Sequence, residues 1–97
     1  MKVIYTEEAL HDLDEILTFI GSHYPGILSA FRSRLRVIER RIANWPMSAE
    51  EVQQRPGVRI VPFIRYPYRL FYRVTDEAVE ILHIYHAARR GPAAERG

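Results

Sequence analysis

The hydrophobic pattern changes its period once along this chain, and that change constrains the fold more than any other feature. Between residues 10 and 45, apolar side chains recur at steps of three and four, which is the spacing of a helical face. Between residues 58 and 86, they alternate at a period of two or run without interruption, as in strands. We therefore expect two helices followed by a small sheet.

The first helix is expected to begin after Thr6, a favourable N-cap that is followed at once by two glutamates. Its predicted core stripe consists of Leu10, Leu13, Leu17, Ile20 and Tyr24. The sequence Tyr24-Pro25-Gly26 ends this helix and leads into a second one after a short link. Two helices joined so closely are expected to form an antiparallel hairpin.

The second helix has the cleaner pattern and is expected to end near Pro46. Its predicted core stripe consists of Leu28, Phe31, Leu35, Ile38, Ile42 and Trp45. Packing in the core is therefore the interpretation for both Phe31 and Trp45. Arginines line the other side of this helix. We interpret this side as a solvated face in preference to a binding site.

Four segments read as strands: residues 2–5, 58–64, 68–75 and 78–86. Pro62 places the second at an edge or bulge, whereas the last is apolar on both faces, as expected of a central strand. Residues 46–57 read as a polar connector. The predicted class is α+β in the order β-α-α-β-β-β, a helical hairpin packed on one face of a small, mainly antiparallel sheet.

A length of 97 residues predicts one domain, which we place at residues 1–90, with residues 91–97 as a mobile tail. The absence of cysteine excludes a disulfide framework and a zinc ribbon, and we expect no cofactor and no metal. No apolar run is long enough to cross a bilayer, and the start of the chain does not resemble a signal peptide. We therefore expect a soluble, cytoplasmic protein with no membrane partner.

The formal net charge of +2 conceals a strong segregation. Residues 1–31 carry five acids and one lysine, whereas residues 32–73 carry ten arginines and three acids. Residues 74–97 are close to neutral, with three arginines and four acids. An anionic partner would therefore be sought at the basic middle of the chain.

Chemistry on the predicted sheet depends on few groups. Arg69, Arg73 and Arg89 could stabilise a phosphate, but a guanidinium stays protonated and is a poor base. The remaining proton-transfer candidates are His83, His86, Tyr72 and Tyr85. Residues 83 and 86 are three apart and point to opposite faces of one strand, so at most one of the two histidines shares the arginine face. A ribonuclease-like histidine pair is therefore not expected.

Two further features have a structural and a functional interpretation. Arg69 and Arg73 fit the solvated face of an antiparallel sheet as well as a binding surface. Four apolar residues close to the start of the alternating strand are hard to bury together, and they form either core or an exposed partner patch: Phe63, Ile64, Tyr66 and Tyr68.

Three sequence strings together resemble the ParE/RelE superfamily of toxins: Pro62-Phe63, then Tyr68-Arg69-Leu70-Phe71-Tyr72-Arg73-Val74, then Ile84-Tyr85-His86-Ala87-Ala88-Arg89. The resemblance spans about residues 2–90. It implies a toxin of a bacterial type II toxin–antitoxin module, also called a plasmid stabilisation protein. It also implies a cognate, ParD-like antitoxin that forms a hetero-oligomer with the toxin, through a helix laid in an apolar groove or a strand added to a sheet edge. The edge candidates are the strands at 2–5 and 58–64.

The two branches of this superfamily imply different targets. The ParE branch poisons DNA gyrase and needs no nuclease site, whereas the RelE branch cuts messenger RNA on the ribosome with basic residues on the open sheet face. Arg69 and Arg89 match arginines of the superfamily motifs, but the lysines common in the RelE branch are absent, and Arg59 is the nearest substitute. We therefore favour a ParE-like gyrase inhibitor.

Two alternatives remain open. One is a RelE-like, metal-independent endoribonuclease centred on Arg69, His86 and Arg89. The other is a basic nucleic-acid-binding module, which the nearly neutral total charge makes the weakest of the three. Across these hypotheses, the candidates for a target-facing surface are Arg59, Arg69, Arg73, His86 and Arg89.

Overall fold

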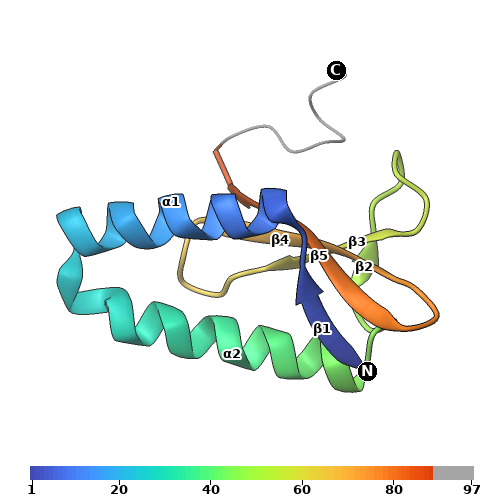
Figure 1. The fold of residues 1–97 in the computed structure, drawn as a ribbon. Helices are drawn as coiled ribbons and strands as arrows, with labels where there is room; N and C mark the ends of the chain where they lie inside the picture. Colours follow the sequence, from blue (N-terminus) through green and yellow to red (C-terminus); the bar gives the residue numbers. More distant parts are fainter. Residues whose placement is uncertain (89–97) are drawn as a thin grey trace.

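The computed structural model describes residues 1–88, which form a layer of helices against a sheet (Figure 1). The elements in chain order are β1 (Lys2–Tyr5), α1 (Glu7–His23), a short 3-10 helix (Pro25–Ile27), α2 (Leu28–Asn44), β2 (Glu50–Glu51), β3 (Val58–Pro62), β4 (Tyr68–Val74) and β5 (Ala78–His86). The predicted tail at 91–97 and the candidate Arg89 lie outside the described residues.

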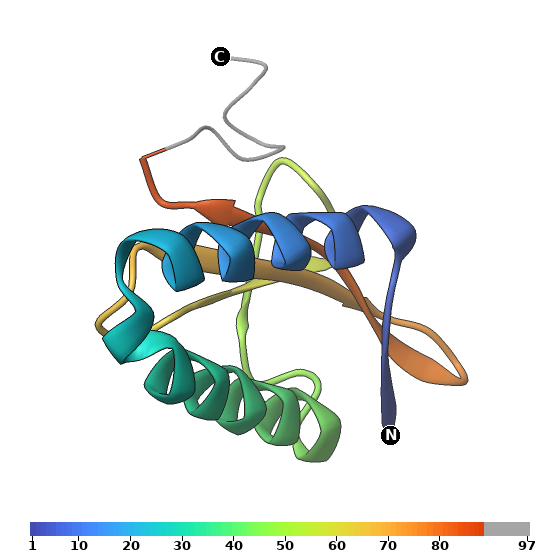
Figure 2. The ribbon, with the colours of Figure 1, turned by 60° about the vertical axis from the view of Figure 1, so that its left-hand side comes forward.

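The described strands form one five-stranded sheet in the order β1-β5-β4-β3-β2. β1 runs parallel to β5, and every other neighbouring pair is antiparallel. Figure 2 shows α1 passing in front of the strands, with α2 below it. The predicted class, a helical hairpin on one face of a mainly antiparallel sheet, is confirmed. β1 is an edge strand as expected, and β5 is interior.

The segment predicted as a polar connector contains a strand that the sequence pattern missed. Glu50 and Glu51 pair antiparallel with Ile60 and Arg59, so the first half of β3 is not an edge. Gly57 closes the loop between β2 and β3 with a positive φ of 86°, a conformation that a glycine adopts without a steric penalty. Two glutamates give no alternating hydrophobic signal, because both side chains of this short strand are exposed.

Helix α1 begins as predicted, since the Thr6 hydroxyl accepts a hydrogen bond from the Ala9 amide at 3.1 Å. The helix buries Ala9, Ile16 and Ile20, so the predicted stripe is rotated from the true core face. Leu10 is 53% exposed in consequence, and Tyr24 is exposed as well. The rotation follows from α1 lying along β5, where the Asp12 carboxylate accepts a hydrogen bond from the Ile84 amide at 3.1 Å.

Helix α2 buries the stripe expected of it up to Ile42 but not beyond. Phe31, Leu35, Ile38 and Ile42 are all buried. Trp45, which we expected in the core, is 65% exposed. The helix ends at Asn44, and Trp45 has φ −135° and ψ 72°, so its side chain leaves the helical stripe. Within residues 1–88, neither α1 nor α2 has the length and hydrophobicity that a membrane span requires.

Candidate functional site

The sheet face that the helices leave uncovered carries Arg69, Phe71 and Arg73 of β4. The intervening residues of β4 face the core, where Tyr68, Leu70 and Tyr72 belong to the main hydrophobic cluster. The pairing register places three β5 residues opposite the first three, in the same order: Tyr85, His83 and Glu80. These six residues define the open face.

The two arginines of the open face differ in their hydrogen-bond and ion-pair partners. The Arg73 Nε donates a hydrogen bond to the Glu80 Oε1 at 2.8 Å, which neutralises that charge locally. Arg69 is exposed and forms no hydrogen bond or ion pair with another residue of the described range 1–88. Arg69 is therefore the cation of the open face that is available to an external anion.

His83 is the histidine that shares this face with the arginines. Its ring stacks on Tyr85 with centroids 4.9 Å apart, and its Nδ1 lies 3.5 Å from the Asp12 Oδ2. Because Asp12 is itself fixed by the Ile84 amide, this contact orients the imidazole and leaves Nε2 for proton transfer. Sequence reasoning allowed one histidine here but did not select His83, and it did not anticipate Asp12.

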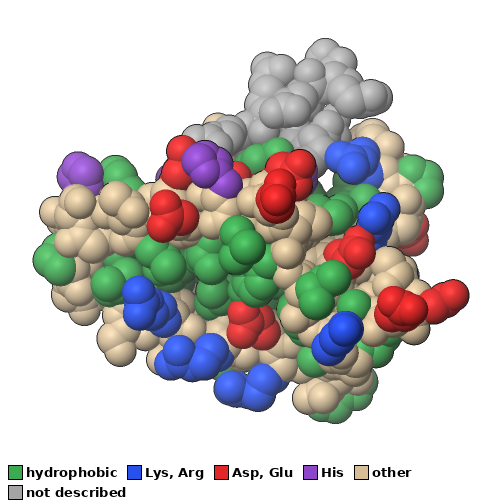
Figure 3. Space-filling view, in the orientation of Figure 1, with side chains coloured by type: hydrophobic (Ala, Val, Ile, Leu, Met, Phe, Trp, Pro, Cys, Tyr) green, Lys and Arg blue, Asp and Glu red, His purple; other side chains and the backbone are tan. Residues whose placement is uncertain are grey.

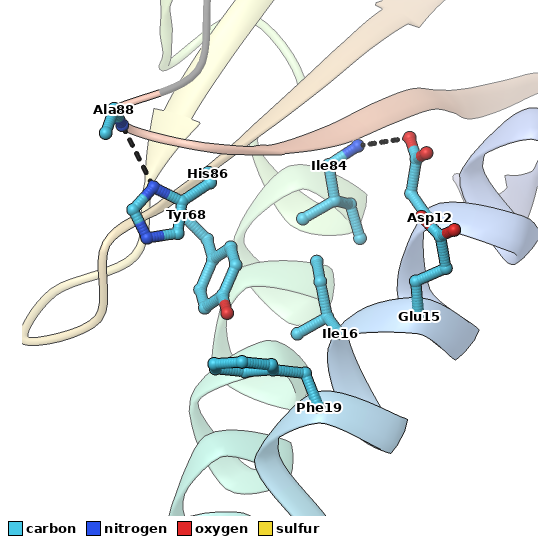
Figure 4. Close-up of a pocket in the computed structure, with 8 residues that line it drawn as sticks. All are labelled: Asp12, Glu15, Ile16, Phe19, Tyr68, Ile84, His86 and Ala88. Carbon is cyan, nitrogen blue, oxygen red and sulfur yellow. Dashed lines mark hydrogen bonds between the residues drawn. The ribbon is translucent and has the colours of Figure 1, made fainter. Parts of the chain in front are cut away.

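His86, the histidine favoured in our ribonuclease alternative, lies on the opposite face. It pairs with Tyr68 across the strands, its ring meets the Tyr68 ring edge-on at 5.3 Å, and its Nδ1 accepts a hydrogen bond from the Ala88 amide at 3.0 Å. Figure 4 shows the Tyr68 ring between His86 and Phe19, in a pocket of about 590 Å³ between α1 and the end of β5. The structure does not bring His86 together with Arg69.

Arg59 also lies on the covered side, because it pairs with the buried Tyr72. Its guanidinium donates to the carbonyls of Ala49 at 2.7 Å and of Met47 at 3.3 Å. These bonds hold the segment that leads into β2. Of the predicted target-facing residues that the structure describes, Arg69 and Arg73 lie on the open face, whereas Arg59 and His86 lie on the covered side.

The predicted partner patch does not exist as one surface. Phe63 and Tyr68 are buried in the core, where Phe63 stacks on Phe31 with centroids 5.1 Å apart. Tyr66 is half-buried against the same cluster. Only Ile64 of the four is exposed, at 60%. The aromatic rings are buried because α2 brings Phe31 beneath the loop between β3 and β4.

Tyr72, one of the proton-transfer candidates, and Tyr68 on the same covered face are both held in the neutral form. Burial raises the pKa of Tyr68 and of Tyr72, although the charge of Arg59 opposes the shift at Tyr72. The Tyr72 hydroxyl donates to the Pro46 carbonyl at 2.5 Å, so it anchors the end of α2. Neither phenol can accept a proton near neutral pH.

The flank of α1 that faces α2 exposes an apolar surface. Figure 3 shows hydrophobic side chains between acidic residues along α1 and basic residues along α2. Leu10 is exposed, and three partly buried leucines pack against the core: Leu13 and Leu17 of α1 and Leu28 of α2. We call these four residues the helix band. Its two borders carry opposite charges, as the segregation in the sequence implies.

The sequence of this chain matches a known protein family over almost its whole length. Residues 3–91 match the family model described as the ParE toxin of type II toxin-antitoxin system, parDE. No curated protein sequence matches the chain.

Several solved structures share the fold. The chromosomal ParDE toxin–antitoxin system of P. aeruginosa matches with a TM-score of 0.75 and 23% identity, over 89% of this chain and 95% of that one. The isolated E. coli RelE toxin matches with a TM-score of 0.65 and 20% identity, over 98% and 92%. The RelBE2 complex of Mycobacterium tuberculosis matches with a TM-score of 0.60 and 27% identity, over 91% and 92%. Since the family model covers nearly the whole chain, this protein belongs to the ParE toxin family of type II toxin–antitoxin systems.

Proposed function

We propose that this toxin inhibits DNA gyrase in the bacterial cytoplasm by binding, without catalysing a reaction. The observation that carries the proposal is the match of residues 3–91 to the ParE family model. The distribution of charged groups supports it. Arg59 is committed to loop carbonyls, Arg73 to Glu80, and His86 to the covered side of the sheet. Of the residues suggested for a ribonuclease, the two that the structure describes, Arg69 and His86, lie on opposite faces of the sheet, which supports binding over cleavage at that set.

A comparison of two activities tests this proposal. We expect the purified toxin to inhibit supercoiling of relaxed plasmid by gyrase and to leave messenger RNA intact on translating ribosomes. The control is the toxin saturated with its antitoxin, which should restore supercoiling. Cleavage of messenger RNA in the ribosomal A site, with supercoiling unaffected, would overturn the gyrase proposal.

One observation favours RelE-like messenger RNA cleavage as a second candidate. The open face combines the unpaired cation of Arg69 with His83, whose ring is oriented by Asp12 and stacked on Tyr85. In this reading the His83 Nε2 removes the proton of the 2′-hydroxyl, whose oxygen forms a bond to the adjacent phosphorus. The bond from phosphorus to the 5′-oxygen breaks, the leaving oxygen takes a proton from water, and Arg69 stabilises the negative charge on the phosphate. Because Arg69 and Tyr85 are paired across the strands, a stacked base would hold its phosphate near the guanidinium.

Replacement of His83 separates the two candidates. Under the gyrase proposal, His83→Gln changes supercoiling inhibition little, because the ring performs no chemistry. Under the ribonuclease reading, the same variant loses cleavage by about 100-fold or more, the usual contribution of a general base. His86→Gln is the matched control, since His86 lies on the other face and neither reading assigns it chemistry.

The partner that neutralises the toxin is proposed to be an antitoxin that lays an amphipathic helix on the helix band. The ParDE and RelBE structures similar to this chain are described as toxin–antitoxin systems or complexes. The band offers exposed and half-buried leucines between an acidic and a basic border, which suits a helix with opposite charges on its two flanks (Figure 3). The edge strand β1 offers a second contact by strand addition.

Substitution within the helix band tests the antitoxin proposal. Leu10→Asp places a charge in the apolar contact and should weaken antitoxin binding by about tenfold or more, without unfolding the toxin. Phe19→Asp is the matched control on the other flank of α1, since Phe19 is exposed to a similar degree, 47% against 53%. Equal losses in the two variants, measured by isothermal titration calorimetry, would place the antitoxin elsewhere.

A further inference from the structure

The loop between β3 and β4 is anchored to α2 by aromatic rings. Phe63 stacks on Phe31 with centroids 5.1 Å apart, and Tyr66 meets Phe31 edge-on at 5.4 Å. The Phe63 amide donates to the Tyr68 carbonyl at 2.9 Å, which closes the loop. Figures 1 and 2 show this loop, in yellow to orange, beside the first half of α2. The loop conformation is therefore fixed from within.

Between these two anchors, Ile64 and Arg65 are turned outward. Ile64 is 60% exposed, although it lies between the buried Phe63 and the half-buried Tyr66. Arg65 has a φ of 79°, the left-handed conformation that costs a residue with a Cβ roughly 1–2 kcal/mol. Backbone strain of this kind persists only where the surrounding packing imposes it. The chain therefore holds an apolar and a cationic side chain in a fixed outward position.

A hollow of about 350 Å³ lies between this loop and α2. The loop contributes Ile64, Arg65 and Tyr66, and α2 contributes Ala30, Ser33, Arg34 and Val37. Val37 is 42% exposed, so each wall of the hollow presents one exposed aliphatic side chain. We call it the α2–loop hollow. It is separate from both the helix band and the open face.

The charge of the α2–loop hollow has one sign. Both charged residues among those that line it are arginines, Arg34 and Arg65. Neither forms a hydrogen bond or ion pair with another residue of the described range, although Arg34 is half-buried. Other arginines of the same chain do find partners, such as Arg59 with loop carbonyls and Arg41 with Ser48. Two unpaired guanidiniums beside two exposed aliphatic side chains form a site for a carboxylate next to an apolar group.

We propose that the α2–loop hollow binds an acidic, amphipathic segment of a partner protein. An apolar side chain of that segment lies between Val37 and Ile64, and flanking Asp or Glu side chains pair with Arg34 and Arg65. Charge complementarity selects this occupant, because the arginines need anions and the exposed aliphatic side chains need apolar cover. The proposal does not depend on gyrase being the target.

The rigid loop favours such binding on energetic grounds. Because the Phe31 cluster already orders Ile64 and Arg65, association does not have to restrict the loop backbone further. The hollow holds one or two side chains, so the interface is small and its affinity depends on the two arginines. A phosphate chain would use the arginines but would leave Val37 and Ile64 uncovered.

The test uses the full-length toxin and a short fluorescein-labelled peptide of alternating leucine and glutamate. Fluorescence anisotropy measures its affinity, and amide chemical shifts in an ¹H–¹⁵N spectrum locate it. We expect saturable binding with shifts at Val37, Ile64 and Arg65. The double variant Arg34→Gln/Arg65→Gln should weaken binding by about tenfold or more, as expected for the loss of charge-assisted hydrogen bonds.

Two further variants separate the site from general electrostatics. Arg32→Gln/Arg40→Gln removes the same charge from other exposed positions of α2 and should change the affinity less than about twofold, as surface charges at a distance usually do. Ile64→Ser keeps both arginines and should also weaken binding, since the site needs its apolar half. Thermal unfolding establishes that each variant is folded.

Several results would overturn the proposal. Equal losses in the two double variants would show attraction by net charge alone. Equal binding of a leucine–lysine peptide would exclude the carboxylate pairing. A single-stranded oligonucleotide that competes fully and is unaffected by Ile64→Ser would make the hollow a phosphate site. Concentration-dependent self-association that Ile64→Ser abolishes would show that the hollow binds a second copy of this chain. The absence of any peptide binding would refute the proposal.

Discussion

The two faces of the sheet belong to the same strands but differ in how their side chains are held. On the covered face, Leu70 and Tyr72 are fully buried beneath the helices. On the open face, Arg69 and Arg73 are exposed at alternate positions of the same strand. Phe71 lies between them and is only 5% exposed, although no helix covers it. The covered face therefore supplies stability, while the open face is free to vary for function except at Phe71.

The largest effect should come from truncation on the covered face. Leu70→Ala removes a fully buried side chain, and we expect a loss of about 3 kcal/mol in the free energy of unfolding. The neighbouring Arg69→Ala on the open face should change it by less than about 0.5 kcal/mol. Urea denaturation of both variants measures the difference. A comparable loss in both would contradict the division of roles between the two faces.

Phe71 tests whether the open face has a core of its own. Its ring lies 5.7 Å from that of Tyr85, and it pairs across the strands with Ile60 and His83. We expect Phe71→Ala to cost about 2 kcal/mol, less than a truncation beneath the helices because water can enter the site from one side. Phe71→Leu should recover most of the loss. A cost below that of Arg69→Ala would mean that the ring contributes nothing to stability.

The contact of Tyr5 with Glu39 predicts how the covered side responds to alkali. The Tyr5 hydroxyl donates to the Glu39 carboxylate and so joins β1 to α2. Burial, the hydrogen bond and the charge of Glu39 all raise the pKa of Tyr5 far above its ordinary value near 10. The folded state therefore holds this proton more tightly than the unfolded state, and stability falls as pH rises above about 10.

Tyr5→Phe should remove part of that pH dependence. We expect the variant to be less stable by about 1.5 kcal/mol at neutral pH, the usual value for a hydrogen bond to a charged group. Its stability should then decline less steeply between about pH 9 and pH 11. Urea midpoints across this range measure both effects, and Tyr24→Phe is the exposed control. Parallel curves for the wild type and Tyr5→Phe would refute the coupling.

Elements with a local signal were predictable from the sequence. The stripe from Phe31 to Ile42 marks its own buried face, because steps of three and four determine which side of a helix is apolar. The alternation in β4 likewise predicts that Arg69 and Leu70 lie on opposite faces of the sheet, and this prediction needs no knowledge of the partner strands. Trp45 continued the step pattern but lay one residue past the end of α2, where backbone angles outside the helical region redirect the side chain.

Features that depend on pairing between distant segments were not predictable. The spacing of His83 and His86 showed that they face opposite sides, but the register with Phe71 and Tyr68 was needed to tell which shares the arginine face. Asp12 lies off the predicted apolar stripe of the first helix, and no local pattern marks it as important. Its role at the Ile84 amide depends on α1 lying along β5, a contact between residues 72 positions apart.

The smallest effect should come from the ion pair on the open face. Arg73 and Glu80 are joined at 2.8 Å, but the Arg73 side chain is 56% exposed, so solvent screens the attraction. We expect a coupling energy of no more than about 1 kcal/mol in a double-mutant cycle of Arg73→Gln and Glu80→Gln, falling further with added salt.

The effect of this ion pair on target binding is more informative than its effect on stability. Glu80→Gln releases Arg73 without changing the covered face, so it gives the open face a second free cation beside Arg69. If the toxin acts on an anionic target through this face, Glu80→Gln should strengthen target binding while Arg69→Gln weakens it. If the two variants change target affinity in opposite directions while leaving stability nearly unchanged, the open face is the surface that contacts the target. If neither variant changes target affinity, the target binds on the helix-bearing side.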